Sequence, residues 1–272
     1  MDSFSKLFIK SFSANSDNVE LFNCVDNIPE KFAYLFVGHW LKGEMGHDRK
    51  NVGLLVKAFY EIFKNKSNPP ALILKSSLGK GSHRDRREIM KRIHSIRKSL
   101  PTAKLPNVYL IHGDISDKDM NELYNHPKVK SMVSPTKGEG FGRPLLEFAL
   151  TGKPVITTGW SGHIDFLNPK LTPLMGGKLG NIHPSAQQKD VLIEGSQWFD
   201  VDHNYVNHFY NDIINNYKEW LEKAKGQGKL SRKEFCFNKM TDKLSEIFDR
   251  NLKKLPKKME LKLPGMDKIK MP

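Results

Sequence analysis

The chain has 272 residues, of which 38% are hydrophobic and 27% charged, a length that allows one large domain or two small ones. This composition is typical of a globular protein whose core needs neither disulfide nor metal. No apolar run reaches the roughly 18–20 residues that span a bilayer, and the N-terminus lacks the pattern of a secretory signal. Cys24 and Cys236 fit no disulfide framework and no metal-binding spacing, which predicts free thiols and a cytoplasmic location.

The formal net charge is +14, and most of the excess lies in two segments. Residues 83–100 hold seven basic side chains against two acidic ones, and residues 251–272 hold seven lysines against two acidic side chains. Neither segment interleaves aromatic residues with its basic ones, as a surface that stacks bases would. Nucleic acid is therefore a disfavoured partner, and we interpret the two segments as a solvated helix face and a basic tail.

Apolar runs of strand length alternate with helical patterns from residue 33 onward. The first run, Ala33–Val37, precedes a helix with an apolar period of 3.6 residues that Asn51 is expected to cap. The second run, Ala71–Leu74, precedes a basic helix over residues 84–100. Each run is too short for a helix and is bounded by polar or loop-forming sequence, so both are predicted strands.

The alternation continues through three more strands. A capping box of Ser116 and Asp119 predicts a short helix after the third strand. A helix over Pro144–Leu150 follows the fourth strand, with proline in its first turn. These later strands are predicted at Val108–Ile111, Val129–Val133 and Pro154–Thr157. Strands that alternate with helices predict a mostly parallel, doubly wound α/β sheet of the Rossmann-like class, with helices on both faces.

The domain organisation follows from this pattern. Residues 1–30 are interpreted as a lead-in, residues 31–252 as one domain, and residues 253–272 as an extended basic tail. Two helices, over about 203–225 and 232–252, are expected to close the domain. The glycines between Gly226 and Gly228 are expected to separate them.

The most informative loop lies between the fourth strand and the next helix. Gly138, Gly140 and Gly142 let the backbone come close to a ligand, and the free N–H groups of the helix start favour an anion. Glu139 lies within this loop and Glu147 one turn into the helix. Because ligands of parallel sheets bind at the carboxyl ends of the strands, both carboxylates are expected to face the same ligand site.

Other glycine motifs predict nothing comparable. The alternating glycines of this loop do not have the spacing of a dinucleotide fingerprint, and their strand is the fourth of the sheet. Gly176 and Gly177 are followed by Lys178 and then Leu179, so the serine or threonine of a phosphate-binding P-loop is missing. Neither a Rossmann oxidoreductase nor a P-loop nucleotidase is supported.

The segment GEGFGRPLLEFALTGKPVITTGWSGHIDFL, residues 138–167, resembles the donor-site signature of retaining glycosyltransferases with the two-Rossmann-domain (GT-B) architecture, the family-4-like group 1 transferases. The resemblance extends over about residues 32–250. It implies a C-terminal donor-binding domain that uses a nucleotide-sugar as substrate, transfers its sugar with retention of configuration to an unknown acceptor, and needs no cofactor or metal. The acceptor domain of such enzymes has no counterpart in residues 1–30, so by this resemblance the sequence is either a fragment of a longer enzyme or a polypeptide that works with a separate acceptor domain or subunit.

The resemblance also implies roles for individual residues. Glu147 would bind the ribose hydroxyls, and Glu139, the implied catalytic residue, would lie beside the donor sugar. The backbone N–H groups of Gly140, Phe141 and Gly142 would surround the sugar and phosphate.

Basic residues would hold the diphosphate in the same resemblance. Lys50 matches the lysine that precedes the first helix. The usual arginine is missing, because His39 follows Gly38, and Lys75 is the substitute cation that we expect. Arg143 is equally compatible with a phosphate contact and with a solvent-facing position.

Three further groups have competing interpretations. His163 either approaches the sugar or caps its own loop. A metal site of His39, His47 and Asp48 is disfavoured because it lacks a second ligand pair. Trp198 and Phe199 are more typical of a core than of a sugar platform.

Three functions remain open on the sequence. Sugar transfer is the leading hypothesis, and the alternative is a non-catalytic module that holds a nucleotide-sugar and needs a partner domain. A nucleic-acid-binding protein is the least favoured, because its basic segments lack interleaved aromatic residues.

Overall fold

The structure is a computed structural model of the chain, and it describes residues 25–79, 81–100, 104–188, 191–193 and 195–252. The chain divides into two compact units, Met1–Arg232 and Lys233–Pro272. Most of the expected lead-in, including Cys24, and the whole expected tail over residues 253–272 lie outside the described residues.

The first unit is built on a parallel sheet. Its described residues form six strands in the order β3-β2-β1-β4-β5-β6, and every neighbouring pair is parallel. In chain order the strands are β1 (Ala33–Val37), β2 (Ala71–Lys75), β3 (Val108–Ile111), β4 (Val129–Ser134), β5 (Val155–Thr158) and β6 (Leu174–Met175). Their continuous apolar runs reflect burial on both faces. The five predicted strands are therefore confirmed, and the two-residue β6 is too short to give a sequence signal.

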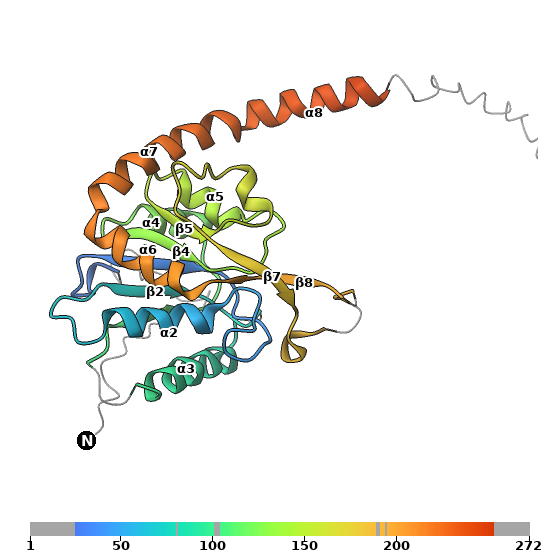
Figure 1. Ribbon diagram of the computed structural model, residues 1–272. Coiled ribbons are helices and arrows are strands. Elements are labelled where there is room, and N and C mark those ends of the chain that lie inside the picture. The colour runs from blue at the N-terminus through green and yellow to red at the C-terminus, as the bar shows by residue number, and fades with distance from the viewer. Residues whose placement is uncertain (1–24, 80, 101–103, 189–190, 194, 253–272) are drawn as a thin grey trace, which may run out of the picture. The chain divides into compact units, whose positions relative to one another are not determined.

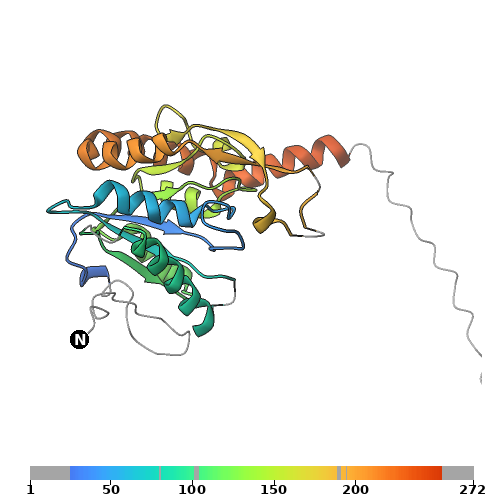
Figure 2. The same ribbon diagram turned by 60° about the horizontal axis from the view of Figure 1, so that its bottom comes forward.

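Helices cover both faces of this sheet (Figures 1 and 2). Helices α2 (Val52–Phe63), α3 (His83–Lys98) and α6 (His203–Asn215) pack together on one face. Helices α4 (Asp117–Asn125) and α5 (Arg143–Ala149) contact the sheet through β4 and β5. The doubly wound α/β class predicted from the sequence is confirmed.

The basic helix α3 packs on the core through a narrow stripe of isoleucine side chains. Its buried residues are Ile89, Ile93 and Ile96, at the spacing of one helix face. Ser82 caps the helix by accepting the N–H of Asp85. The basic side chains of α3 therefore belong to the remaining, solvated part of the helix surface, as expected.

An aromatic cluster ties the first strand to the helices on its face. Tyr34 of β1 lies edge-on to Tyr210 of α6, with ring centroids 4.8 Å apart, and its hydroxyl donates to the Tyr210 carbonyl oxygen at 2.6 Å. Phe59 and Phe63 of α2 complete the cluster. This packing fixes the position of α2, and with it the residues that precede α2.

The N-terminus of α2 differs from the prediction. Asn51 is the N-cap residue, but its φ is +57° and its side chain makes no capping hydrogen bond. The carboxylate of Asp48, which is completely buried, instead accepts the N–H of Val52 at 3.1 Å. Asn51 has a left-handed backbone conformation, which asparagine tolerates better than most residues. With Asn51 in this conformation, the Asp48 carboxylate caps the helix in place of the Asn51 side chain.

The expected break between two closing helices is also wrong. Gly226 and Gly228 lie inside α7 (Tyr217–Glu234). A Cβ on Gly228 would lie 3.0 Å from the carbonyl oxygen of Ala149 and 3.2 Å from the Cα of Gly152. The glycine therefore allows close packing of α7 on the turn after α5, and this tertiary contact outweighs the low helix propensity of glycine.

A hairpin absent from the predictions follows the sheet. Strands β7 (Gly177–Asn181) and β8 (Gln197–Val201) pair antiparallel. The hairpin is joined to the glycine loop, because the N–H of Phe199 donates to the carbonyl oxygen of Lys137 at 3.0 Å and the buried Lys137 ammonium pairs with Asp200.

The described part of the second unit contains helix α8 (Phe237–Leu252) and no buried helical residue. Among the described residues of both units, no helix is long and apolar enough to cross a membrane.

Candidate functional site

The site begins with two loops at the carboxyl ends of the strands. Lys50 ends the loop between β1 and α2, and Glu139 lies in the glycine loop between β4 and α5. The Lys50 ammonium donates a hydrogen bond to Glu139 Oε1. Arg49 donates to the Gly138 carbonyl oxygen, and its Nη1 lies 3.4 Å from Glu139 Oε2. We call Arg49, Lys50 and Glu139 the cation cluster.

Two members of the cation cluster are shielded from solvent, whereas the Arg49 side chain is 33% exposed. Lys50 is 9% exposed, and the Glu139 side chain is also 9% exposed. Burial raises the pKa of Glu139, but the charge and hydrogen bond of Lys50 outweigh it, so the pKa lies below the ordinary value. Glu139 is therefore ionised at neutral pH, and the cluster keeps one positive charge in excess. Such a charge balance favours a bound anion.

The glycine loop is held in place by the segment that follows β5. Ser161 Oγ donates to the Glu139 carbonyl oxygen at 2.6 Å and accepts the Glu139 N–H at 3.0 Å. The N–H of Gly162 donates to the same carbonyl oxygen at 3.0 Å, and a Cβ on Gly162 would lie 2.1 Å from the Gly140 carbonyl oxygen. Sequence reasoning did not single out Ser161. Its position inside the WSGHIDFL segment was the available signal.

The remaining residues of the loop lead into α5. Gly142 has a φ of +88° and is the N-cap of the helix, which explains the need for glycine there. Gly140 and Phe141 are exposed, and the Phe141 ring lies against Phe166 with centroids 5.3 Å apart. The loop thus presents backbone to solvent beside the cation cluster. The donor-binding roles of Gly140, Phe141 and Gly142 stay predictions.

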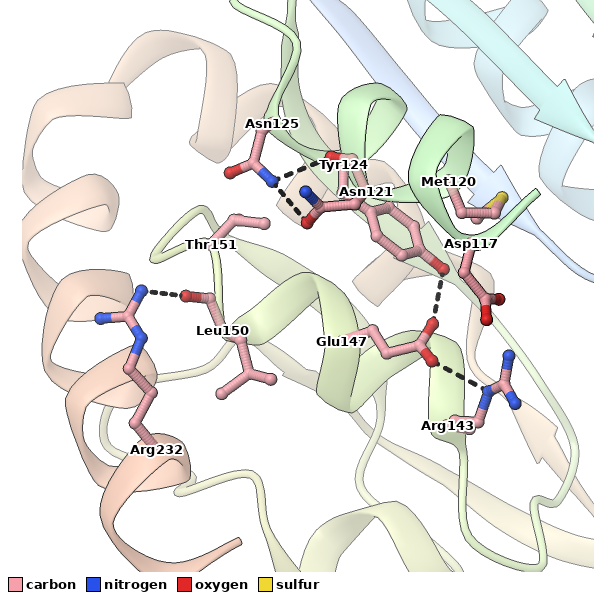
Figure 3. A pocket seen from close by; sticks show the side chains of 10 residues that line it. All are labelled: Asp117, Met120, Asn121, Tyr124, Asn125, Arg143, Glu147, Leu150, Thr151 and Arg232. Carbon is pink, nitrogen blue, oxygen red and sulfur yellow. Dashed lines mark hydrogen bonds and ion pairs between the residues drawn. The ribbon is translucent and has the colours of Figure 1, made fainter. Parts of the chain in front are cut away.

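Glu147 lies in a different group of side chains, shown in Figure 3. Its Oε2 accepts the Tyr124 hydroxyl at 3.2 Å, and its Oε1 lies 2.9 Å from Nε of Arg143. Burial, with a smaller contribution from Glu147, raises the pKa of Tyr124, so the phenol keeps its proton and donates it. Arg143 is largely exposed.

A cavity of about 490 Å³ opens beside Glu147. It is lined by Asp117, Met120, Asn121, Tyr124, Asn125, Arg143, Glu147, Leu150, Thr151 and Arg232. The structure thus gives Glu139 and Glu147 separate partners. The lining offers the Glu147 carboxylate and the amides of Asn121 and Asn125 as hydrogen-bonding groups. Sequence reasoning missed Tyr124 as the partner of Glu147, since nothing in the sequence relates the two positions.

Lys75 lies apart from the cation cluster's ion pairs. Its ammonium donates to the Gly113 carbonyl oxygen at 2.7 Å, in the loop after β3. Burial lowers its pKa, and the nearby carboxylate of Asp114 acts in the opposite direction. Its role as a phosphate-binding cation stays a prediction.

His163 has a structural role in the loop after β5. It is completely buried, and its Nε2 donates to the Thr158 carbonyl oxygen at 2.6 Å. This favours the loop-capping interpretation over contact with a sugar.

The disfavoured metal site is not assembled. His39 contacts Ser77 at 2.8 Å, and His47 stacks on His183 with ring centroids 3.8 Å apart. Among the residues that the structure describes, no group of three His, Cys, Asp or Glu side chains could hold a metal ion.

Phe199 is buried and stacks on Trp160, with centroids 6.0 Å apart. It is therefore part of the packing, as expected, while Trp198 is half-buried beside it.

The topology of the sheet identifies the fold class. The six-stranded parallel sheet in the order β3-β2-β1-β4-β5-β6, with its covering helices, is one Rossmann-like half of the GT-B architecture. Residues 34–175 match the family described as "Glycosyl transferases group 1". Because this match covers more than half of the chain, the chain belongs to that family.

Solved structures show the same fold at low sequence identity. The C-terminal domain of the group 1 glycosyl transferase LpcC from Francisella tularensis is 13% identical, with a TM-score of 0.53, and the match covers 82% of this chain and 95% of that one. Anabaena HepE in complex with UDP-glucose is 13% identical, with a TM-score of 0.55, and the match covers 88% of this chain and 54% of HepE. Sucrose-phosphate synthase from Thermosynechococcus elongatus is 16% identical, with a TM-score of 0.56, and the match covers 87% and 50%.

The chain thus spans about half the length of HepE and of the synthase, and nearly the whole LpcC domain. No curated protein matches the chain significantly.

Proposed function

We propose that this chain is the donor-binding domain of a glycosyltransferase that uses a nucleotide-sugar and retains the configuration of the transferred sugar. The observation that carries the proposal is the buried pair of Lys50 and Glu139, with Arg49 beside it, at the carboxyl edge of the sheet. A nucleoside diphosphate leaving group develops negative charge as its bond to the sugar breaks. Fixed cations in a desolvated site stabilise that charge in the transition state.

The donor would lie along two groups of side chains. The diphosphate would contact Lys50 and Arg49, and the ribose hydroxyls would bind Glu147, whose carboxylate Tyr124 and Arg143 hold in place. HepE, with which the chain shares its fold, is solved with UDP-glucose. Because Arg49 and Lys50 leave one positive charge in excess of Glu139 at this site, we expect the phosphates of the donor to be held there without a divalent metal.

The proposed retention rests on the likeness to retaining transferases, and a single carboxylate beside the sugar limits the routes by which it could occur. A covalent route with two carboxylates needs both of them within reach of the anomeric carbon. Glu139 belongs to the cation cluster, whereas Glu147 is held by Tyr124 and Arg143. We therefore favour attack of the acceptor on the same face that the phosphate leaves, with the leaving phosphate assisting the proton transfer.

The second candidate is a binding module that holds the donor without turning it over. The match covers 54% of HepE, and a module of this kind would bind the donor and leave the acceptor to another domain or subunit. Transfer requires an acceptor held within about 3–3.5 Å of the reacting carbon, in a site that excludes water. A second domain or subunit would hold the acceptor and exclude water from the site.

Two measurements separate these candidates. Thermal unfolding with UDP-, GDP- and ADP-sugars identifies the donor, since a ligand at 100 times its Kd stabilises a protein by about 2.7 kcal/mol. The purified chain is then incubated with that donor and a library of sugar acceptors, and products are read by mass spectrometry. We expect binding with at most slow hydrolysis. Rapid transfer by the chain alone would show that this chain builds the acceptor site itself, and failure to bind any donor would contradict both candidates.

A further inference from the structure

A cavity of about 550 Å³ is lined mainly by the loop that precedes α2 and by the hairpin of β7 and β8. Two contacts join these segments: the His47 ring stacks on His183 with centroids 3.8 Å apart, and the N–H of Glu44 donates to Ser185 Oγ at 3.1 Å. The volume falls within the range of small-molecule sites in proteins, about 300–1,000 Å³. The lining contains no member of the cation cluster and none of residues 140–142. The cavity is therefore separate from the site proposed for the donor.

Asn51 lines this cavity with a polar side chain that the fold leaves unused. The residue is 2% exposed, and its Oδ1 has no hydrogen-bond partner among the described residues. The side chain does not cap α2, because the Asp48 carboxylate accepts the N–H of Val52 instead. A buried acceptor without a donor is costly, so this oxygen is suited to a ligand that donates a hydrogen bond.

Two other groups of the lining are hydrogen-bond donors. The Nδ1 of His183 accepts the N–H of Ser185 at 3.2 Å, so the neutral imidazole carries its proton on Nε2. Within the described residues, neither this Nε2 nor the indole Nε1 of Trp198 has a hydrogen-bond partner. Trp198 is half-buried, and its indole combines an N–H donor with a large flat apolar surface.

The charged side chains of the lining already have partners. Lys137 pairs with Asp200, and Lys57 lies 3.8 Å from a carboxylate oxygen of Glu61. Burial and two nearby basic side chains lower the pKa of His47, so its ring is neutral at pH 7. The groups that remain for a ligand are thus neutral donors and a neutral acceptor. They favour hydroxyl groups over a phosphate or a carboxylate.

We propose that this cavity is a saccharide-binding site that takes one neutral pyranose ring. Hydroxyl groups of the ring would donate to Asn51 Oδ1 and accept from His183 Nε2 and Trp198 Nε1. The C–H groups on one face of the ring would pack on the indole of Trp198. The proposal does not rest on the proposed function, because the site needs neither a nucleotide nor the cation cluster.

The test is saturation-transfer NMR on the full chain with no nucleotide present. The probes are the methyl glycosides of glucose, galactose, mannose and N-acetylglucosamine, and inorganic phosphate is the competitor. Trp198→Ala removes the indole, and Asn51→Gly removes the unpartnered amide while keeping a residue that readily adopts the φ of +57°. Trp160→Ala is the matched control, because Trp160 is 41% exposed and lies outside the lining. Circular dichroism checks that each variant is folded, and Asn51→Gly carries the test if Trp198→Ala does not fold.

At least one glycoside should receive saturation from the wild-type chain. Trp198→Ala should raise the Kd of that glycoside by at least about tenfold, since tryptophans in binding sites contribute strongly. Asn51→Gly should raise it by about three- to tenfold through the loss of one hydrogen bond. Trp160→Ala should stay within about twofold of the wild type, as a surface substitution away from the site does. Inorganic phosphate should not displace the glycoside.

Four results would overturn the proposal. The first is the absence of saturation transfer to all four glycosides. The second is equal binding by the wild type and the folded cavity variants, or equal losses in Trp198→Ala and Trp160→Ala. Displacement by inorganic phosphate would assign the cavity to an anion. A loss of binding in Glu139→Gln, with normal binding by the cavity variants, would place the sugar at the proposed donor site instead.

Discussion

Lys50 and Glu139 lie 89 residues apart in the chain and form a buried ion pair where two loops meet at the carboxyl edge of the sheet. Lys50 is positioned by the packing of α2 on the sheet, and Glu139 by the hydrogen bonds of Ser161 to its backbone. The ion pair therefore depends on two separate sets of contacts, the packing of α2 and the hydrogen bonds of Ser161. In the proposed function it is the point where the diphosphate and the sugar of the donor meet.

Removing the lysine should weaken donor binding. Lys50→Ala deletes a cation that would contact the diphosphate, and a hydrogen bond to a charged group contributes about 1.5–3 kcal/mol. We expect a loss of that size in the binding free energy of the nucleoside diphosphate, measured by titration calorimetry.

Lys57→Ala is the matched control for Lys50→Ala. Lys57 lies on α2, the helix that follows Lys50, and pairs with Glu61, and its side chain is 39% exposed. It should leave the affinity unchanged, because exposed ion pairs contribute little. Equal losses in the two variants would contradict the role given to Lys50.

Glu147→Ala should weaken binding of the nucleoside itself by about 1.5–3 kcal/mol, because two ribose hydroxyls would lose a charged acceptor. Glu122→Ala is a close control: its side chain is 33% exposed against 35% for Glu147, and it too has a basic partner one helical turn away. Calorimetry with a free nucleoside and with its diphosphate measures both variants. Unchanged affinity in a folded Glu147→Ala protein would exclude the ribose assignment.

The cation cluster predicts a pH-dependent part of the stability. The folded pKa of Glu139 lies below its ordinary value of 4.5, because Lys50 outweighs the effect of burial. The unfolded state then binds more protons between the two pKa values, so this contribution to the free energy of unfolding is complete above the ordinary value and is lost as the pH falls through the folded one.

Glu139→Gln lacks this contribution at every pH. The wild type should therefore exceed the variant in stability most clearly at about pH 7, and the difference should shrink on acidification below about pH 4. Urea unfolding across this range measures it. A difference that did not vary with pH would mean that the charge of Glu139 does not contribute.

The two glycines of α7 should respond differently to alanine. A Cβ on Gly226 would meet only the Leu171 side chain, at 3.6 Å, whereas a Cβ on Gly228 would lie 3.0 Å from a backbone oxygen. Gly226→Ala should stabilise the protein by about 0.5–1 kcal/mol through helix propensity. Gly228→Ala should destabilise it by about 1–3 kcal/mol through overpacking. Thermal unfolding measures both, and a stabilising Gly228→Ala would contradict the close packing of α7.

Most of the sheet could be predicted because β1, β2 and β3 are largely apolar, buried runs, and because they alternate with segments that have helical signals. Ser82 and Ser116 cap α3 and α4 as such residues ordinarily do. The hairpin of β7 and β8 gave no comparable signal, because its first strand is largely exposed and contains two glycines. The cap of α2 and the continuity of α7 were predicted wrongly, since Asp48 and Gly228 act through contacts that local patterns do not contain.

The site residues were named from a resemblance, and the structure adds what that resemblance lacked. Arg49, Ser161 and Tyr124 became visible only as partners of Glu139 and Glu147. Partners so distant in the chain leave no periodic or spacing signal in a single sequence.

The proposed function requires that protein cations alone hold a nucleoside diphosphate. The most direct measurement is titration calorimetry of the chain, treated with EDTA, against UDP, GDP and ADP. Saturable binding of at least one of them, unchanged by added magnesium or manganese and weakened by about 1.5–3 kcal/mol in Lys50→Ala, is the predicted result. Binding that appears only after a divalent metal is added, or none with any of the three, would contradict it.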